Sequence, residues 1–413
     1  MVLQLARKLA ATVLGQDPHD PKAVQELKQA GVPVSEASCR TCADPCDEGH
    51  EEFSKRFDVD METEMRGSVK PYRRQVIIST GKADWAREVT EEHDSLAKYL
   101  SSAEDRHSGG VRKKVAPPSP SSEKKTEKHH DEKPADATTN STSTSKQSTG
   151  VYNYKPSGRL SIVNGSHHTI SDDSDTQATV LVLPDYVAVT NVPISNAGAS
   201  ALWEHALDPA VPCAGTWITP GSEGMKTWTL PYNCLIMLCS HKRRDARCHI
   251  AAERLHEDFA RSLESEGWCV DTDLEDLSSI GPPLESIAPT EEARKAAAVE
   301  QLRALVSEDA FPIEQANEEE QNQEARTADD QNQANAKQRK ALILKNSHIG
   351  GHKFAGNVII YFPQGSSVWY GRVTPHEVHT IVQHTILGGK VLPQLLRGGL
   401  GIARPGCASL LDW

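Results

Sequence analysis

The chain has 413 residues, and its 57 acidic side chains outnumber its 45 Lys and Arg, giving a formal net charge of −12. This balance excludes the concentrated positive charge that nucleic-acid binding needs, and no apolar run approaches the roughly 20 residues of a membrane helix. Hydrophobic residues (37%) and aromatic residues (5%) are too few for a chain folded throughout. We therefore expect two domains of ordinary size, with part of the length disordered.

The first residues and the cysteine count bear on location. Met1–Gln16 lacks acidic residues and contains Arg7 and Lys8. It forms either an ordinary surface helix, which we favour, or a weak mitochondrial presequence. Nine cysteines, an odd number without a regular framework, indicate a reducing compartment and free-thiol or ligand roles. We predict a cytoplasmic protein, with a mitochondrial location as the alternative.

Residues 1–70 form an N-terminal segment with a cysteine cluster. Its spacing is Cys39-x2-Cys42-x3-Cys46, which could bind Zn²⁺. The fourth ligand is not obvious, and His50 is the nearest candidate. The alternative is an exposed segment with free thiols.

A first domain, residues 71–230, is predicted to alternate strands and helices around a disordered insertion. The insertion, 108–150, is rich in Ser, Thr, Lys and Pro and cannot bury enough apolar surface to fold. The predicted strands are Gln75–Ser79, Leu160–Val163, Val180–Leu183 and Val187–Thr190, and the predicted helices are Asp84–Leu100 and Ala199–Leu207.

A second domain, residues 231–413, repeats this order. Its insertion, 281–340, is rich in Glu, Gln, Asn and Ala, so we expect it to be mostly disordered apart from one helix at Thr290–Ser307. The predicted strands are Leu235–Leu238, Leu342–Leu344, Val358–Phe362 and Val368–Val373, and the predicted helices are Ile250–Ser265 and His376–Ile386.

The order strand, helix, insertion, three strands, helix thus occurs twice. The local text also repeats, as SIVNGSH at Ser161–His167 and ILKNSHIGGH at Ile343–His352. Alternating strands and helices indicate an α/β fold. We predict two thioredoxin-like domains that form a tandem, degenerate repeat.

Two short motifs in the second domain carry the chemistry. Cys239-x8-Cys248 follows one apolar strand, and His348-x3-His352 follows another. Two thiolates and two imidazoles brought together at strand ends make a four-ligand metal site. Such a set suits Zn²⁺ or a [2Fe–2S] cluster with histidines on one iron. The intervening Gly350-Gly351 favours a loop clamp over a helix.

The loop between the two cysteines is basic. It holds four Lys and Arg residues, which should lower the thiolate pKa values and offset negative charge formed on reduction. Arg243, Arg244 and Lys353 are therefore candidates for tuning the site or docking a partner. The alternative is a solvated surface loop beside a buried cysteine.

Four stretches of the chain resemble the fungal thioredoxin-like ferredoxin family, also described as sucrase/ferredoxin-like. Three lie in the second domain and one in the N-terminal segment. They are LCSHKRRDARCHIAAERLHEDF at Leu238–Phe259, SHIGGHKFAGNVIIYF at Ser347–Phe362, WYGRVTPHEVHTIVQH at Trp369–His384 and SCRTCADPCDEGHEEF at Ser38–Phe53. A shorter match, STGKADW, ends at Trp85.

The resemblance implies a [2Fe–2S] cluster ligated by Cys239, Cys248, His348 and His352. The protein would then be a one-electron carrier or redox sensor rather than an enzyme that turns over a substrate. Because imidazoles can exchange a proton as the cluster changes oxidation state, we expect a pH-dependent potential.

Two alternatives remain open at this stage. One is a structural zinc protein that acts as an interaction module. The other is a thiol oxidoreductase that uses Cys239 and Cys248, although such enzymes prefer a CxxC spacing. Nothing in the sequence identifies an acid/base pair, a P-loop or a GxGxxG motif.

The chain ends in Leu411-Asp412-Trp413. A terminal aliphatic–acidic–aromatic tripeptide resembles the signal by which the cytosolic iron–sulfur assembly machinery captures its clients. We therefore predict that machinery as a partner, alongside a redox partner that the sequence does not name. The signal also favours the cytosol.

Overall fold

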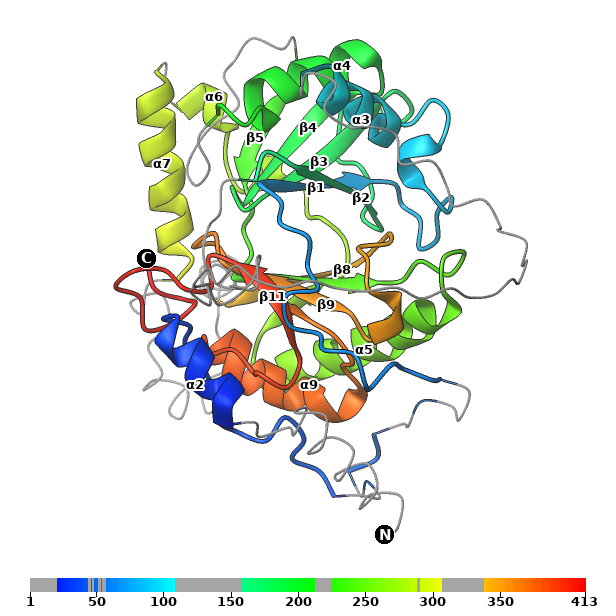
Figure 1. Ribbon diagram of the computed structural model, residues 1–413. Coiled ribbons are helices and arrows are strands. Elements are labelled where there is room, and N and C mark those ends of the chain that lie inside the picture. The colour runs from blue at the N-terminus through cyan, green and yellow to red at the C-terminus, as the bar shows by residue number, and fades with distance from the viewer. Residues whose placement is uncertain are drawn as a thin grey trace, which may run out of the picture.

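In the described residues of the computed structural model, the chain has two halves that share the order strand, helix, three strands, helix and strand, with additional elements in the second half (Figure 1). The described residues are 21–43, 46, 48–50, 53, 57–107, 157–211, 224–287, 290–306 and 338–413. Helix α2 (Pro21–Gln29) precedes the first half. That half contains β1 (Arg74–Ser79), α3 (Leu96–His107), β2 (Leu160–Gly165), β3 (Gln177–Leu183), β4 (Val187–Pro193), α4 (Asn196–Leu202) and β5 (Lys226–Thr229).

The second half follows directly. It contains β6 (Cys234–Cys239), α5 (Ala246–Ser265), β7 (Cys269–Asp271), α6 (Leu284–Ile287), α7 (Glu291–Ala304), β8 (Lys340–Asn346), β9 (Val358–Tyr361), β10 (Ser367–Tyr370), α9 (Pro375–Ile381) and β11 (Leu396–Leu400). In both halves the last helix continues into a π-helical turn, Trp203–Leu207 after α4 and Val382–Leu387 after α9.

The described strands form one mixed sheet in the order β11-β10-β9-β6-β8-β2-β1-β3-β4-β5, with β7 beside β8. In each half a central strand, β1 or β6, has a parallel neighbour on one side and successive antiparallel strands on the other. The two halves meet at a single antiparallel pair, Gly165 and Asn346. The α/β class is confirmed. That each half is a thioredoxin-like domain stays a prediction.

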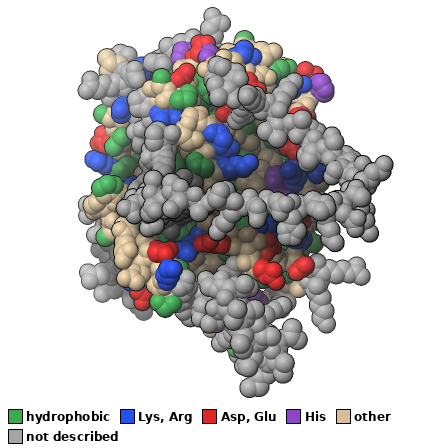
Figure 2. Space-filling model, in the orientation of Figure 1, with side chains coloured by type: hydrophobic (Ala, Val, Ile, Leu, Met, Phe, Trp, Pro, Cys, Tyr) green, Lys and Arg blue, Asp and Glu red, His purple; other side chains and the backbone are tan. Residues whose placement is uncertain are grey.

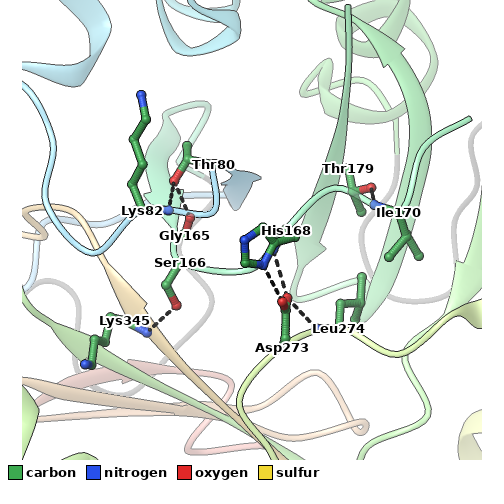
Figure 3. Close-up of polar contacts among 10 residues, drawn as sticks. All are labelled: Thr80, Lys82, Gly165, Ser166, His168, Ile170, Thr179, Asp273, Leu274 and Lys345. Carbon is green, nitrogen blue, oxygen red and sulfur yellow. Dashed lines mark hydrogen bonds and ion pairs between the residues drawn. The ribbon is translucent and has the colours of Figure 1, made fainter. Parts of the chain in front are cut away.

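Further hydrogen bonds reinforce this narrow contact between the two halves. The Ser166 N–H donates to the Lys345 carbonyl at 2.9 Å, and the Ser166 hydroxyl accepts from the Lys345 N–H at 3.1 Å. Nearby, the His168 N–H donates to Asp273, just beyond β7, at 2.8 Å (Figure 3). The carboxyl end of β2 is therefore fastened to the second half at two places.

Alternating side chains divide the interior into three apolar cores. Ile77 of β1 lies in a core shared with Leu235 and Met237 of β6. Val76 and Ile78 point the other way, into a core with α3 and α4. Because the shared core takes residues from both halves, the two parts of the sheet pack face to face. Helices α3 and α4 cover one outer side, and α5 and α9 cover the other (Figure 1).

Most described residues of the segment between α2 and β1 pack on the second half, and only its last residues contact the neighbouring first half. We name its described residues within 32–69 the N-terminal strap. Near its start, Val34 forms a β-bridge with Val391. Towards its end, the Arg372 side chain donates to the Asp60 carbonyl at 2.7 Å. In Figure 1 the strap runs around the lower half of the molecule before it rises to β1.

The helix predicted at Asp84–Leu100 begins only at Leu96, so this prediction was wrong for about its first three turns. The Ser95 hydroxyl accepts from the Lys98 N–H at 3.2 Å and so starts the helix there. The preceding residues form a loop with one short 3-10 turn. Trp85 within it is buried and turns towards the second half.

The two sheet edges, β5 and β11, were missed by the sequence analysis. Their sequences are KTWT and LRGGL. These contain Thr and Gly and have fewer aliphatic residues than the interior strands. Short edge strands with few apolar residues give little periodic signal. Their pairing comes from the sheet itself, β5 on β4 and β11 on β10.

Part of the predicted second insertion is folded. The helix expected at Thr290–Ser307 is present as α7, and Thr290 caps it by accepting from the Ala293 N–H. Leu284 of α6 packs with Ala298, and Leu302 reaches the shared core. Residues 307–337, the first insertion and Met1–Gln16 lie outside the described residues.

The described helices include none long and apolar enough to cross a membrane. On the face shown in Figure 2, acidic and basic side chains are interspersed with hydrophobic ones.

Candidate metal centre

Two of the predicted ligands meet at one edge of the second-half sheet. Cys239 is the last residue of β6 and pairs with Asn346 of β8. Because β6 and β8 are parallel, their carboxyl ends share an edge of the sheet. The loop after β8 therefore carries His348 back past Cys239.

Contacts with the first half hold this loop. The Ser347 N–H donates to the Asn164 carbonyl at 2.9 Å, and the Ser347 hydroxyl accepts from the Asn164 N–H at 3.0 Å. The His348 N–H donates to Nδ1 of His241 at 3.2 Å, while Nε2 of His241 lies 3.0 Å from the Trp85 carbonyl. His241 thus accepts at Nδ1 and donates at Nε2, which is a neutral imidazole.

Cys248 lies in the first turn of α5. Asp245 caps this helix, because its side chain accepts from the Arg247 N–H at 3.0 Å. The Cys248 N–H donates to the Asp245 carbonyl at 3.1 Å. The helix predicted at Ile250–Ser265 begins four residues earlier, because the Asp245 cap starts it at Ala246.

Cys239 and Cys248 form a buried, hydrogen-bonded pair, with 2% and 1% of each residue exposed. Hydrogen bonds from Cys248 and His348 hold the pKa of Cys239 well below its ordinary value. The hydrogen bond to Cys239, and then burial, raise the pKa of Cys248. The shifts thus favour Cys239 over Cys248 as the deprotonated sulfur of this hydrogen-bonded pair. The basic loop, which we expected to lower both values, is not the main cause of either shift.

The two histidines form a second pair. Gly350 and Gly351 have φ of 85° and 72°, and this left-handed turn brings the rings of His348 and His352 to 5.4 Å between centroids. Nδ1 of His348 is buried without a hydrogen-bond partner in the described part of the chain. His352 is exposed to solvent. Partial burial of its ring, and then the neighbouring His348, lower the pKa of His352.

A buried arginine, Arg397 at the start of β11, lies beside the thiols. Its guanidinium donates to the Gly350 carbonyl at 3.2 Å and to Asn357 at 2.6 Å, both neutral groups. Burial lowers the pKa of Arg397 to about 10, while the negative charges of Cys239 and Cys248 act in the opposite direction. Arg397 is thus a fixed positive charge at the site, and the sequence analysis missed it.

Three basic residues predicted to tune the site each lie opposite a carboxylate. The pairs are Arg243–Asp84 at 3.4 Å, Arg244–Glu88, and Lys353–Asp60 at 3.4 Å. The acidic partners come from the first half and from the strap. The side chains of Arg243 and Lys353 remain 68% and 46% exposed, so they are accessible to a partner.

Apolar side chains cover the thiols. Ala355 packs against Cys239 and Cys248, and Phe57 and Val59 of the strap complete the cover with Ile349. Water is thereby restricted on the cysteine side of the site, whereas the histidine side is open.

A second Cys/His group lies on the strap. It consists of Cys42, Cys46 and His50 with His376 of α9, and their ligand atoms all lie within 4.8 Å of one another. This group could hold a metal ion. His376 would be the fourth ligand, which the sequence did not reveal because more than three hundred residues separate it from the cysteines.

Cys39, the first cysteine of the predicted motif, lies outside this group. It packs against the second-half core, and burial raises the pKa of its thiol to about 12, so the thiol is protonated at neutral pH. Of the three cysteines in the predicted zinc motif, only Cys42 and Cys46 therefore belong to the group.

The last three residues lie against the second half. The Asp412 carboxylate accepts from the Ala408 N–H at 2.6 Å, and Trp413 is 45% exposed beneath the Arg303 guanidinium. Leu411 is half-buried. Capture by the iron–sulfur assembly machinery and a cytosolic location stay predictions.

The fold and these groups describe a mixed α/β protein with a Cys/His site able to hold a metal. Residues 65–398 match the family described as sucrase/ferredoxin-like, and the chain belongs to this family. The match spans both halves of the chain. No solved structure matches the chain.

Several curated relatives share the name altered inheritance of mitochondria protein 32. The chain is 54% identical over 55 residues to the one from Debaryomyces hansenii, covering 13% of this chain and 20% of the relative. Identity is 52% over 52 residues for Clavispora lusitaniae (13% and 19%) and 45% over 64 residues for Candida glabrata (14% and 20%). The matched stretches thus span about a fifth of these relatives.

Proposed function

We propose that Cys239, Cys248, His348 and His352 hold a [2Fe–2S] cluster and that the protein carries or senses single electrons. The observation that carries the proposal is the arrangement of a buried thiol pair and a more exposed imidazole pair in contact with each other. Family membership supports it, because the family's description includes ferredoxin-like proteins.

The pairing favours two metal ions over one. A single tetrahedral Zn²⁺ needs its four ligand atoms at similar, short separations. Within the described part of the chain, the strap group meets that condition, with all its ligand atoms within 4.8 Å. The Cys239 site instead offers one pair of sulfur ligands and one adjacent pair of nitrogen ligands, as a cluster with two irons requires.

The cluster would supply a one-electron couple, and the surrounding residues set its conditions. Arg397 places a buried positive charge beside the thiolates, which favours the more negative, reduced state. Phe57 and Val59 keep water from the cysteines. His352, which is exposed, can exchange a proton with solvent when the site changes charge.

A dithiol oxidoreductase is the second candidate, because Cys239 and Cys248 form a hydrogen-bonded pair in which the pKa of Cys239 is lowered. The variant His352→Ala separates the two functions. It should abolish or sharply reduce the iron content and the visible absorption if histidines are ligands. A pure dithiol would keep its reactivity in this variant, and retained iron with retained colour would contradict the proposal. His379→Ala, an exposed histidine on α9, is the matched control.

A further inference from the structure

We propose that Cys42, Cys46, His50 and His376 bind one structural Zn²⁺ that fastens the N-terminal strap to α9. This site is separate from the proposed cluster and shares no residue with it. The inference stands or falls independently of the proposed function.

The four side chains already have the geometry of a single-ion site. Sγ of Cys42 lies 3.1 Å from Nδ1 of His376, and Sγ of Cys46 lies 3.4 Å from Nδ1 of His50. The two imidazole rings meet edge to face, with centroids 5.3 Å apart. With Zn–S near 2.3 Å and Zn–N near 2.0 Å, a tetrahedral ion separates its ligand atoms by about 3.5–4 Å, so small shifts would suffice.

The ligand set selects zinc. Two thiolates neutralise Zn²⁺ and two neutral imidazoles complete a closed tetrahedron, which is typical of structural sites and leaves no open position for catalysis. The four ligand atoms are too close together to surround two irons and their bridging sulfides. The half-buried setting also favours a site with no net charge.

The local structure holds the ligands in place before an ion binds. His376 lies in the first turn of α9, where Thr374 and Glu377 form a capping box. Gly49 has φ of 78°, a left-handed turn that directs His50 back towards the cysteines. The strap thus supplies three ligands from a short stretch, and α9 supplies a fixed fourth.

The site lies upstream of the strap residues that cover the thiols. From His50 the chain continues to Phe57 and Val59, which pack on Cys239 and Cys248. An ion that anchors the strap at α9 therefore restricts how far this cover can open. We expect loss of the ion to loosen the cover without removing any ligand of the proposed cluster.

Zinc and iron are measured by mass spectrometry on the full-length protein. The wild type should contain about one zinc per chain, and Cys42→Ser and His376→Ala should each lose most of it while they retain any iron. Cys39→Ser and His379→Ala are the controls, since they lie beside the site without being ligands, and should keep zinc. Zinc that stays at the wild-type level in folded Cys42→Ser would overturn the proposal.

A second measurement is made on the wild-type protein and tests the zinc site even if the variants do not fold. Wild-type protein stripped of zinc by a chelator is titrated with Co²⁺, and a tetrahedral thiolate site should give intense ligand-field absorption that Zn²⁺ abolishes at one equivalent. Limited proteolysis should cut the strap faster in the stripped protein, and added Zn²⁺ should restore protection. Absence of the cobalt spectrum in the stripped wild type would also overturn the proposal. A wild-type protein that binds zinc but contains no iron would count against the proposed function and not against the zinc site.

Discussion

The two halves of the molecule place different residues at equivalent positions of one scaffold. β1 with its parallel partner β2 corresponds to β6 with β8. The last pair of the first set is Ser79 with Gly165, and that of the second is Cys239 with Asn346. Each parallel partner is followed by Ser and then His, so His167 takes the position of His348.

The first half therefore keeps a histidine but not the cysteine beside it. His167 is fully buried, and burial lowers its pKa to about 4. His348 instead is hydrogen-bonded to Cys239 and precedes a turn that brings up a second histidine. The comparison teaches that the scaffold positions the strand ends, while the two cysteines and the Gly-Gly turn create the site.

The largest expected effect comes from making the second half resemble the first. Cys248→Ser should remove the proposed cluster, with loss of iron, sulfide and visible absorption, because one iron would lose one of its two thiolate ligands. Iron, sulfide and the absorption spectrum are the measurements. Ser79→Ala changes the position matching Cys239 in the other half and should leave all three unchanged. A coloured Cys248→Ser protein with full iron would refute the ligand assignment.

The next effect concerns the imidazole pair. A double variant, His348→Cys with His352→Cys, should keep a cluster but lower its potential by an amount on the order of several hundred mV, because thiolates add negative charge. The wild-type potential should fall as the pH rises, since loss of a proton from an imidazole stabilises the oxidised state, and the double variant should lack this slope. Redox titration followed by EPR measures both. A flat wild-type profile from neutral to alkaline pH would show that the histidines do not couple electrons to protons.

A smaller shift should follow removal of the buried charge. Arg397→Gln should lower the potential by an amount on the order of 100 mV, the effect of one nearby charge at an effective dielectric constant of about 20. Arg397→Lys keeps the charge and should recover much of the shift. Equal potentials in the wild type and the Gln variant, with iron content intact, would show that Arg397 acts only through packing.

The last prediction concerns His167, which should affect the stability of the protein and leave the metal site unchanged. Its pKa of about 4 lies below that of an exposed histidine, so between about pH 4 and 6.5 the unfolded chain binds more protons than the folded one. The free energy of unfolding should therefore fall, by an amount on the order of 3 kcal/mol, as the pH drops through this window. His167→Gln should flatten that dependence in thermal or denaturant unfolding and leave iron unchanged. Parallel pH curves for the two proteins would mean that His167 titrates normally.

The sequence predicted the α/β class and most central strands because their aliphatic runs are long and well spaced. It also brought Cys239 and Cys248 together, since a strand end and a helix start adjoin whenever the loop between them is short. It missed His376 and Arg397, whose contacts join residues far apart in the chain. Nor could periodicity show that the strap would pack on the second half, because that depends on a surface formed only in the folded protein.

The most direct test is to quantify iron, sulfide and zinc in one sample of anaerobically purified full-length protein, and to record its absorption and its EPR spectrum after dithionite. We predict visible absorption, about two iron and two sulfide per chain, and a reduced-state EPR signal of a histidine-ligated [2Fe–2S] cluster. A colourless protein that binds only zinc, and that still fails to take up iron and sulfide on reconstitution, would contradict the account.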